Sequence, residues 1–430
     1  MKIIRAISRF GFGILFVISG FLKAIDPIGT ALKIDEYLGA FHLGFMDFLS
    51  VPLSLLLTSA EFITGVAILK GLRIQFFSKI ALGFISFFTL LTLWIWVFNP
   101  ISDCGCFGEA LHLGNGATFM KNLVLLAAAL AIFFQRSKFH PIAMPKVEWG
   151  YIGLYAVLAI SLQLYSLRNI PPIDFGLYKP GTDLIASKEA IQEREYETTL
   201  IYSKDGKEES FTIDNLPDST WTFVDAKSVL VNGAAEDSSV DLSFMDAEGN
   251  PAGNEILAKE GPEFFVSIYN ARRLNKKAAG KIMDLADTLQ AHNIKLYIIS
   301  SNSAEETQKL LASADSLALQ KYEILYSDYK AVISLNRSNG GLTYIDNGVI
   351  VKKWSRRNYP ISNIGNILSQ DPEIITATTQ IDERLFAEIS LFIIFFLIVI
   401  IRFTSKIIYN KRFTKLTHLH LHKPTSSDPQ

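Results

Sequence analysis

Cysteine is scarce in this sequence of 430 residues, which contains two thiols in all. Cys104 and Cys106 are too few to build the disulfide framework of a small secreted domain. Basic charge is not in excess either, because 41 Lys and Arg residues stand against 42 Asp and Glu residues and the formal net charge is −1. A protein that binds nucleic acid usually has a basic domain or stripe. We therefore expect no nucleic-acid partner.

Apolar residues, in contrast, are abundant. They make up 49% of the chain against 19% for charged residues, and 31 residues are Phe. With a mean hydropathy of +0.26, the chain is too apolar for an ordinary soluble protein of this size. A membrane-spanning helix needs about 20 mostly apolar residues. Six segments are candidates: Ile7–Leu22, Phe48–Leu69, Phe76–Phe98, Thr118–Phe134, Tyr151–Leu167 and Leu385–Phe403. The sequence thus predicts an integral membrane protein with about six spans.

The distribution of Lys and Arg predicts the orientation, since these residues gather in short cytoplasmic loops. They are frequent before the first span, after the second and fourth spans and in the tail, whereas none lies between Asn99 and Ala117. We expect both termini in the cytoplasm, and the cysteines and residues 170–384 outside. The basic, apolar start also resembles a signal peptide, but its run ends in Phe21-Leu22-Lys23, a poor cleavage site. We therefore expect an uncleaved first helix.

The soluble segment between the fifth and sixth spans has two patterns. Thr198–Tyr202 and Ser210–Ile213 flank a turn sequence and predict a hairpin in a small β-rich module. Ser303 and Glu306 form a capping-box pattern, and Asn347-Gly348 is typical of a type I′ hairpin turn. Further expected strands are Trp221–Val224, Val240–Met245, Phe264–Tyr269, Leu296–Ile299, Ile324–Tyr326, Leu342–Ile345 and Val349–Trp354, and the expected helices are Lys276–Ala291, Ala304–Ala314 and Ile361–Leu368. The later elements predict a mixed sheet flanked by helices.

The two cysteines lie between the third and fourth spans, in the segment Asp103–Gly108. One Gly separates them and permits a tight turn, so the thiols can come within disulfide reach. Three interpretations stay open. In an oxidising compartment the pair could cycle through a strained and therefore oxidising disulfide. It could instead be a static bridge or a packed turn. The thiols could also capture a soft metal, although two thiolates with only His112 nearby make an incomplete zinc site.

Charged residues inside the spans are further candidates. A carboxylate within a membrane span is costly, and Glu61 lies in the middle of the second span. It is either a polar packing contact of the bundle or a residue of a binding site. Lys23 ends the first span and Lys121 opens the fourth, both toward the outer face. For these lysines we favour anchoring at the membrane interface over a role in binding.

The first four spans resemble the DoxX family and the related MauE family of methylamine-utilisation membrane proteins. The resemblance rests on Ser19–Pro27 after the first span, on the segment around Glu61, and on Asp103–Gly108 followed by Thr118–Asn122, and it covers residues 1–135. The arrangement is similar to DoxX-type proteins of Bacteroidetes that carry an extra soluble domain. It implies a four-helix bundle in a bacterial inner membrane, with a cysteine-bearing outer loop. It also implies help with disulfide maturation of a periplasmic amine dehydrogenase, although this sequence contains no dehydrogenase.

Residues 240–370 resemble a thioredoxin-like domain of periplasmic thiol–disulfide proteins. After its first strand that family has Cys-x-x-Cys, whereas Asn270–Asn275 contains no cysteine, and Gly340-Gly341 stands where the family has its cis-Pro loop. Without a thiol the domain is not itself an oxidoreductase, and we expect a degenerate binding platform. Arg272 and Arg273 replace the thiol motif at the expected start of a helix, where cations oppose the helix dipole. This uncompensated cost suggests that they bind an acidic partner or headgroup.

These expectations combine into a multi-pass α-helical membrane bundle, with a four-helix DoxX/MauE-like core plus two further spans, and a thioredoxin-like α/β domain preceded by a small β-rich module. The expected parts are residues 1–135 (bundle), 136–169 (cytoplasmic loop and fifth span), 170–239 (β-rich module), 240–370 (thioredoxin-like domain), 371–404 (linker and sixth span) and 405–430 (basic cytoplasmic tail).

Three functions stay open from the sequence. The first is an accessory protein of periplasmic thiol redox or protein maturation, in which Cys104 and Cys106 act on a protein partner docked by the soluble domain. Membrane lipid surrounds this bundle, and a quinone is its candidate electron acceptor. The second is a non-catalytic scaffold or assembly factor whose cysteines are structural. The third is a membrane enzyme or transporter that works through Glu61. The sequence names neither the substrate nor the partner.

Overall fold

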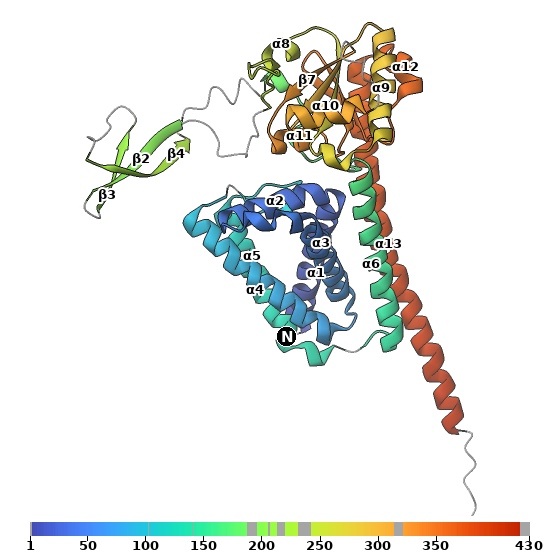
Figure 1. Ribbon diagram of the computed structural model, residues 1–430. Coiled ribbons are helices and arrows are strands. Elements are labelled where there is room, and N and C mark those ends of the chain that lie inside the picture. Colours follow the sequence, from blue (N-terminus) through green and yellow to red (C-terminus); the bar gives the residue numbers. More distant parts are fainter. Residues whose placement is uncertain are drawn as a thin grey trace, which may run out of the picture.

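The computed structural model describes residues 2–101, 103–139, 141–186, 196–204, 207–212, 220–230, 242–313 and 321–421. Figure 1 shows a bundle of long helices, an α/β domain above one end of it, and a small sheet to the side. We call the end of the bundle beneath the α/β domain its outer end. The helical elements of the bundle and its flanks are α1 (Lys2–Ile25), α2 (Pro27–Ala40), η1 (Gly44–Leu49), α3 (Ser50–Lys70), α4 (Ile74–Phe98), α5 (Asn115–Phe134), η2 (Arg136–Lys138), α6 (Pro145–Arg168) and α13 (Pro372–Leu421).

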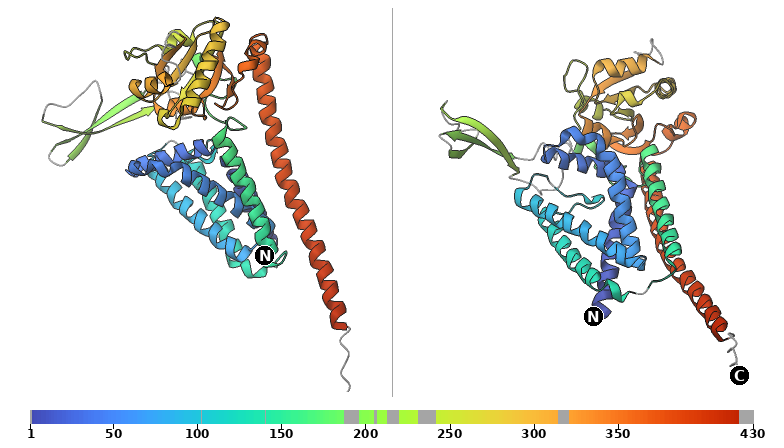
Figure 2. Two further views of the ribbon diagram at one scale, coloured as in Figure 1. Left: turned by 45° about the vertical axis from the view of Figure 1, so that its right-hand side comes forward. Right: turned by 60° about the horizontal axis from the view of Figure 1, so that its bottom comes forward.

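Five helices in the described part of the chain are long and apolar enough to cross a membrane. They confirm the first five predicted segments and cover Ile3–Ile25, Gly44–Lys70, Ile74–Phe98, Asn115–Phe134 and Pro145–Arg168. The sixth predicted span is helical within α13 and stays a prediction. Ile394 of α13 shares an apolar cluster with Tyr155 and Ala159 of α6, so α13 runs along the bundle. Figure 2 shows that α1 begins, and α13 ends, on the side away from the α/β domain.

Helices α1 and α3 approach each other so closely that glycine is required between them. A Cβ on Gly20 would lie 2.7 Å from the backbone N of Phe62, and a Cβ on Gly65 would lie 2.7 Å from the backbone N of Val17. Small residues allow membrane helices to pack closely, and this packing stabilises them where lipid weakens the hydrophobic effect between helices. The α1–α3 pair is therefore the tightly packed part of the bundle.

Alanine at Gly65 is expected to destabilise the bundle by about 1–3 kcal/mol, because the added methyl group must displace the backbone of α1. Alanine at Gly83 of α4, where nothing lies within 4 Å, is the matched control. It should stabilise the helix by roughly 0.5–1 kcal/mol, since alanine is the better helix former. Thermal unfolding of the full chain in detergent measures both. A Gly65→Ala variant as stable as Gly83→Ala would show that the two helices can move apart freely.

Helix α2 lies across the outer end of the bundle rather than along it (Figure 1). Asp26 caps it by accepting a hydrogen bond from the backbone N–H of Gly29 at 2.9 Å, and Pro27 occupies its first turn. Both residue types are favoured at these positions. Ile28 and Leu32 of this helix are buried in one cluster with Ile333 of the α/β domain. Helix α2 is absent from the predicted elements, because its 14 residues are too few for a membrane span.

The β-rich module is an antiparallel sheet with the order β3-β2-β4. Its strands are β2 (Tyr196–Lys204), β3 (Lys207–Thr212) and β4 (Thr222–Leu230), and β2 and β3 form the predicted hairpin. The prediction of a strand over Val240–Met245 is wrong for its described residues. Met245 forms only isolated bridges, to Pro251 and Tyr326. Leu242 and Phe244 are instead buried against one face of the sheet of the α/β domain. This packing explains why apolar residues alternate with polar ones here without forming a strand of the sheet.

The α/β domain contains a mixed sheet with the order β7-β6-β5-β8-β9. Strands β5, β6 and β7 are parallel, and β8 and β9 are antiparallel to their neighbours. The elements are α8 (Gly253–Leu257), β5 (Pro262–Ile268), η3 (Ala271–Arg273), α9 (Lys276–Ala291), β6 (Leu296–Ser300), α10 (Ala304–Ala312), β7 (Tyr322–Tyr326), α11 (Tyr329–Leu335), β8 (Gly341–Asp346), β9 (Val349–Trp354), η5 (Ile361–Asn363) and α12 (Ile364–Leu368). One face packs on α9, α10 and α12, and the other packs on α8 and α11.

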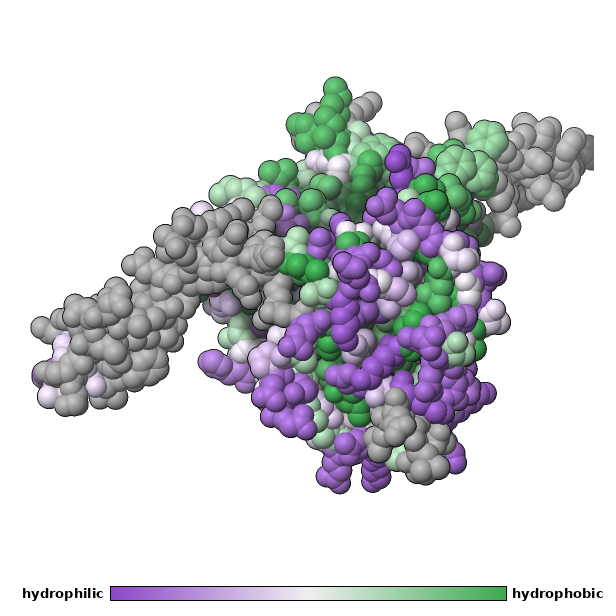
Figure 3. Space-filling view, turned by 90° about the horizontal axis from the view of Figure 1, so that it is seen from above, coloured by the Kyte–Doolittle hydropathy of each residue, from purple (hydrophilic) through white to green (hydrophobic). Residues whose placement is uncertain are grey.

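Several local predictions in this domain are confirmed. Helix α9 has the predicted bounds, and Ser303 caps α10 by accepting from the backbone N–H of Glu306. Asn347 and Gly348 both have positive φ, 47° and 77°, as a type I′ turn requires. One expectation is wrong: residues 181–184 were expected in the β-rich module. They instead form backbone hydrogen bonds with β9 and its turn, and they cover this edge of the sheet. Seen from above, the domain presents mainly hydrophilic residues (Figure 3), as expected for a surface in water.

Candidate functional site

The two cysteines form a disulfide at the outer end of the bundle, with their Cα atoms 5.5 Å apart. Gly105 between them has a φ of +61°, which glycine adopts without strain. Strand β1 (Cys106–Glu109) continues the loop. The hydroxyl of Ser19 in α1 donates a hydrogen bond to the carbonyl oxygen of Cys106, and the hydroxyl of Tyr37 in α2 donates one to that of Cys104. The bridge agrees with the redox and static interpretations. Its sulfurs are not thiolates, the form that binds soft metals.

Charges on α2 fix the start of this loop. Lys33 forms ion pairs with Asp103 at 2.5 Å and with Glu36 at 3.2 Å, and His112 lies 2.9 Å from Asp103. Burial raises the pKa of Asp103, but Lys33 and His112 outweigh it and hold that pKa below its usual value. Burial lowers the pKa of Lys33, but Asp103 and Glu36 outweigh it and the pKa is raised. Both groups are therefore charged at neutral pH.

Lys23 and Glu61 form a buried ion pair between α1 and α3. Lys23 Nζ lies 2.6 Å from a carboxylate oxygen of Glu61, and the side chains are 6% and 8% exposed. Anchoring of Lys23 at the membrane interface is therefore wrong, because its ammonium points into the bundle toward a carboxylate. The ammonium of Lys121 lies 4.5 Å from the centre of the Phe107 ring, next to the disulfide. Both lysines thus face the protein interior.

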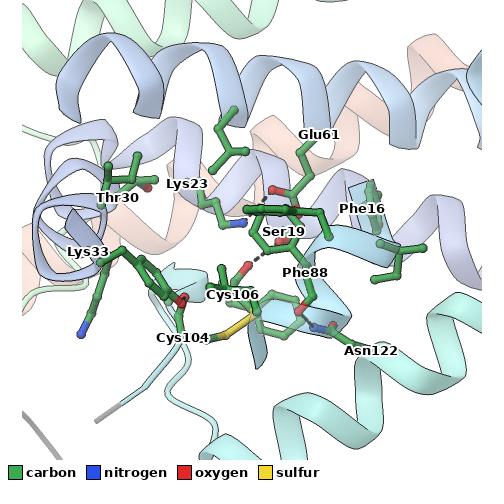
Figure 4. Close-up of a pocket in the computed structure, with 18 of the residues that line it drawn as sticks. Phe16, Ser19, Lys23, Thr30, Lys33, Glu61, Phe88, Cys104, Cys106 and Asn122 are labelled. Carbon is green, nitrogen blue, oxygen red and sulfur yellow. Dashed lines mark hydrogen bonds and ion pairs between the residues drawn. A yellow bond between two sulfur atoms is a disulfide. The ribbon is translucent and has the colours of Figure 1, made fainter. Parts of the chain in front are cut away.

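A pocket of about 340 Å³ lies beside the disulfide and is lined mainly by apolar side chains. Figure 4 shows the bridge at its edge, and Ser19, Lys23, Glu61 and Phe88 among the other residues that line it. Leu56 of α3 and Phe87 of α4 also line the pocket and are 69% and 61% exposed on the surface of the bundle. The pocket therefore opens sideways between α3 and α4, on the surface that lipid would cover.

The predicted site residues fall into two groups in space. Cys104, Cys106, Lys23, Glu61 and Lys121 all line the pocket. Arg272 and Arg273 lie in η3 of the α/β domain instead. Sequence reasoning missed the polar residues that hold the cysteine loop. These residues are Asp26, Lys33, Asp103, Glu109 and Arg337. Asp26 and Asp103 stood within the motifs that carry the family resemblance, but nothing in a linear pattern pairs them with distant cations.

The interpretation of Arg272 and Arg273 as cations that oppose a helix dipole is wrong. Helix α9 begins at Lys276, and Asn275 caps it by accepting from the backbone N–H of Ala278. Arg272 is 83% exposed and pairs with Glu306 at the start of α10, where a carboxylate is favoured. An exposed pair of this kind contributes roughly 0–1 kcal/mol. The placement of Arg272 therefore carries no uncompensated cost.

This geometry defines a multi-pass helical membrane protein with an α/β domain over a disulfide-bearing outer end. Residues 1–135 match the model of the family described as methylamine utilisation protein MauE, so the bundle is similar to that family of membrane proteins. Residues 196–233 match a model described as a domain of unknown function, DUF8463. Searches of curated proteins and of solved structures found no significant match. The matched range agrees with the predicted four-span domain.

Proposed function

We propose that this protein is an accessory factor of protein maturation that exchanges disulfides with a protein outside the membrane. The observation that carries the proposal is the Cys104–Cys106 bridge at the edge of a pocket in the bundle. A thiolate of the partner attacks one sulfur of the bridge and releases the other as a thiolate. The partner's second thiolate then breaks the mixed disulfide. The partner gains a disulfide, and Cys104 and Cys106 become two thiols.

A quinone dissolved in the membrane is the proposed acceptor that restores the bridge. Two electrons and two protons leave the thiols of Cys104 and Cys106 and convert the quinone to a quinol, as the disulfide forms again. The sideways opening of the pocket suits a ligand that arrives from lipid, and its volume suits a ring system. In the described residues Lys121 has no ion pair or hydrogen bond, so its ammonium is available to a quinone oxygen.

The proposed location is a bacterial inner membrane, with both termini in the cytoplasm and residues 170–384 in the periplasm. The asymmetry of Lys and Arg between loops supports this orientation. The placement of the α/β domain opposite the start of α1 agrees with it (Figure 2). The order of the five strands supports a thioredoxin-like relationship, and the absence of cysteine from that domain leaves exchange to the bundle.

The thiol state of the two cysteines in cells tests the proposal. Cells that express the full chain are quenched with acid, and free thiols are labelled with a maleimide that shifts mobility on a gel. We expect a mixture of bridged and reduced chains that moves toward the reduced form when quinone is depleted. The double variant Cys104→Ser/Cys106→Ser gives the unlabelled background. A pair that stays fully bridged under every condition would favour the scaffold function, in which the bridge only holds the loop.

A further inference from the structure

The α/β domain contacts the bundle through one deeply buried cation. Arg337 follows α11, and its side chain is 4% exposed. Its Nε donates a hydrogen bond to Asp26 Oδ2 at 3.0 Å, and its Nη2 lies 3.1 Å from Glu109 Oε1 in an ion pair. Both carboxylates belong to the bundle. Nη1 donates to the carbonyl oxygen of Ile333 within the α/β domain, which fixes the guanidinium from behind.

A buried guanidinium is stable only beside anions, because the transfer of a charge out of water is costly. Asp26 and Glu109 satisfy this requirement, and Asp174 adds a third carboxylate close to Arg337. Burial lowers the pKa of Arg337, but these three carboxylates outweigh it and raise the pKa. Asp174 is itself bound by Lys353 of β9 at 2.7 Å. The contact therefore sets three carboxylates against two cations, Arg337 and Lys353.

An apolar cluster also joins the α/β domain to the bundle. Ile333 of α11 is buried in one cluster with Ile28 and Leu32 of α2, and Leu167 and Tyr269 pack against that cluster. An interface with a desolvated centre and a polar rim is typical of specific protein contacts. Lys330, 3.5 Å from Glu36, forms part of that rim. The contact thus combines shape, apolar burial and charge.

The two carboxylates that Arg337 binds lie at the ends of the elements that hold the cysteines. Glu109 ends β1, the strand that begins with Cys106. Asp26 caps α2, which carries Tyr37 and Lys33, the partners of Cys104 and of its neighbour Asp103. We propose that the α/β domain is docked on the bundle by Arg337, and that Arg337 is a positioning residue for the cysteine loop. The soluble domain then supplies a residue that holds the cysteine loop in place, in addition to any role in binding an external partner.

Hydrogen exchange of the full-length protein in detergent tests the docking. In an Arg337→Ala variant we expect the backbone amides of residues 26–40 and 103–112 to exchange about tenfold faster, because both segments lose a buried anchor. Arg272→Ala is the matched control, since it removes an exposed, paired arginine of the same domain, and it should leave both segments unchanged. Arg337→Lys keeps the charge but supplies a single point contact, and should give an intermediate rate. Unchanged exchange in Arg337→Ala would overturn the docking.

The rate at which dithiothreitol reduces the bridge tests the positioning. We expect reduction to be about tenfold faster in Arg337→Ala, with Arg272→Ala like the parent, because a loosened loop opens more often. A changed hydrogen exchange with an unchanged reduction rate would overturn the positioning role and leave the docking. Neither measurement depends on the proposed function. An effect of Arg337 on oxidation of a partner rests on that function, and a bridge that never cycles in cells would remove that effect alone. If Arg337→Ala fails to fold, Arg337→Lys provides both readouts.

Discussion

Serine in place of Cys106 is expected to leave a fraction of Cys104 joined to the partner protein by a mixed disulfide. In this variant the Cys104 thiolate can attack a disulfide of the oxidised partner and form a mixed disulfide. Cys106 is the group of this chain that would break this mixed disulfide and release the partner in reduced form, as the reverse of the proposed exchange. Without Cys106 the complex persists until the partner's own second thiolate attacks it. Non-reducing electrophoresis should show a larger band that disappears on reduction, and mass spectrometry of the band identifies the partner.

The Cys104→Ser variant and the double variant show whether the band reports disulfide exchange or whether the bridge is only structural. Cys104→Ser should trap less or nothing if Cys104 is the sulfur that the partner meets first. The double variant should abolish exchange and leave the helices folded, since Ser19 and Tyr37 bind backbone carbonyl oxygens of the loop and not its sulfurs. If both single variants and the double variant support partner maturation like the parent, the bridge is structural. The scaffold function would then stand alone.

Alanine at Glu61 is expected to cost about 3–5 kcal/mol of stability, because it leaves the ammonium of Lys23 buried without its anion. Thermal unfolding of the full chain in detergent should show the loss as a lower transition temperature. Glu323→Ala is the matched control, since Glu323 of β7 pairs with Lys295 on the exposed surface of the α/β domain. Such a pair contributes roughly 0–1 kcal/mol. A Glu61→Ala variant as stable as this control would show that Lys23 finds another partner or reaches water.

Replacing both members of the pair separates its two possible roles. Lys23→Met together with Glu61→Met removes both charges at similar volume, and such swaps are often neutral or stabilising. We expect the double variant to regain most of the stability that Glu61→Ala loses. If it is folded and still exchanges disulfides, the pair is a packing contact. If it is folded but its cysteines no longer return to the bridged form, the pair belongs to the site, as its place in the pocket wall suggests.

The features that the sequence predicted well depend on neighbours in the chain. The bounds of α9, the cap at Ser303 and the turn at Asn347-Gly348 follow from patterns a few residues long. The five spans follow from length and apolar composition. The alternation that predicted a strand over Val240–Met245 was a local pattern too, but the tertiary structure uses it to cover a sheet. A period of two reports which side chains are buried and does not report backbone pairing.

The features that the sequence did not predict depend on charges far apart in the chain. The place of Lys23 at the end of a span favours anchoring at the membrane interface, but its ammonium lies 2.6 Å from the carboxylate of Glu61. Arg337 is one of 41 basic residues, and nothing near it in the chain indicates that it is buried against Asp26. Conversely, Arg272 attracted attention through its position in a motif, while its anion, Glu306, lies on another helix. Pairing of this kind is decided by the fold.

The contact between Arg337 and Asp26 also has a consequence for how the protein is made. The two residues are 311 positions apart, so a ribosome that adds about 5–20 residues per second completes Asp26 roughly 15–60 seconds before Arg337. In that interval the outer carboxylates of the newly inserted helices have no guanidinium and must stay hydrated. In the proposed orientation, the outer end of the nascent bundle is therefore open to water and to oxidising enzymes where its two thiols lie. The disulfide can therefore form during translation, before Arg337 binds Asp26 and Glu109.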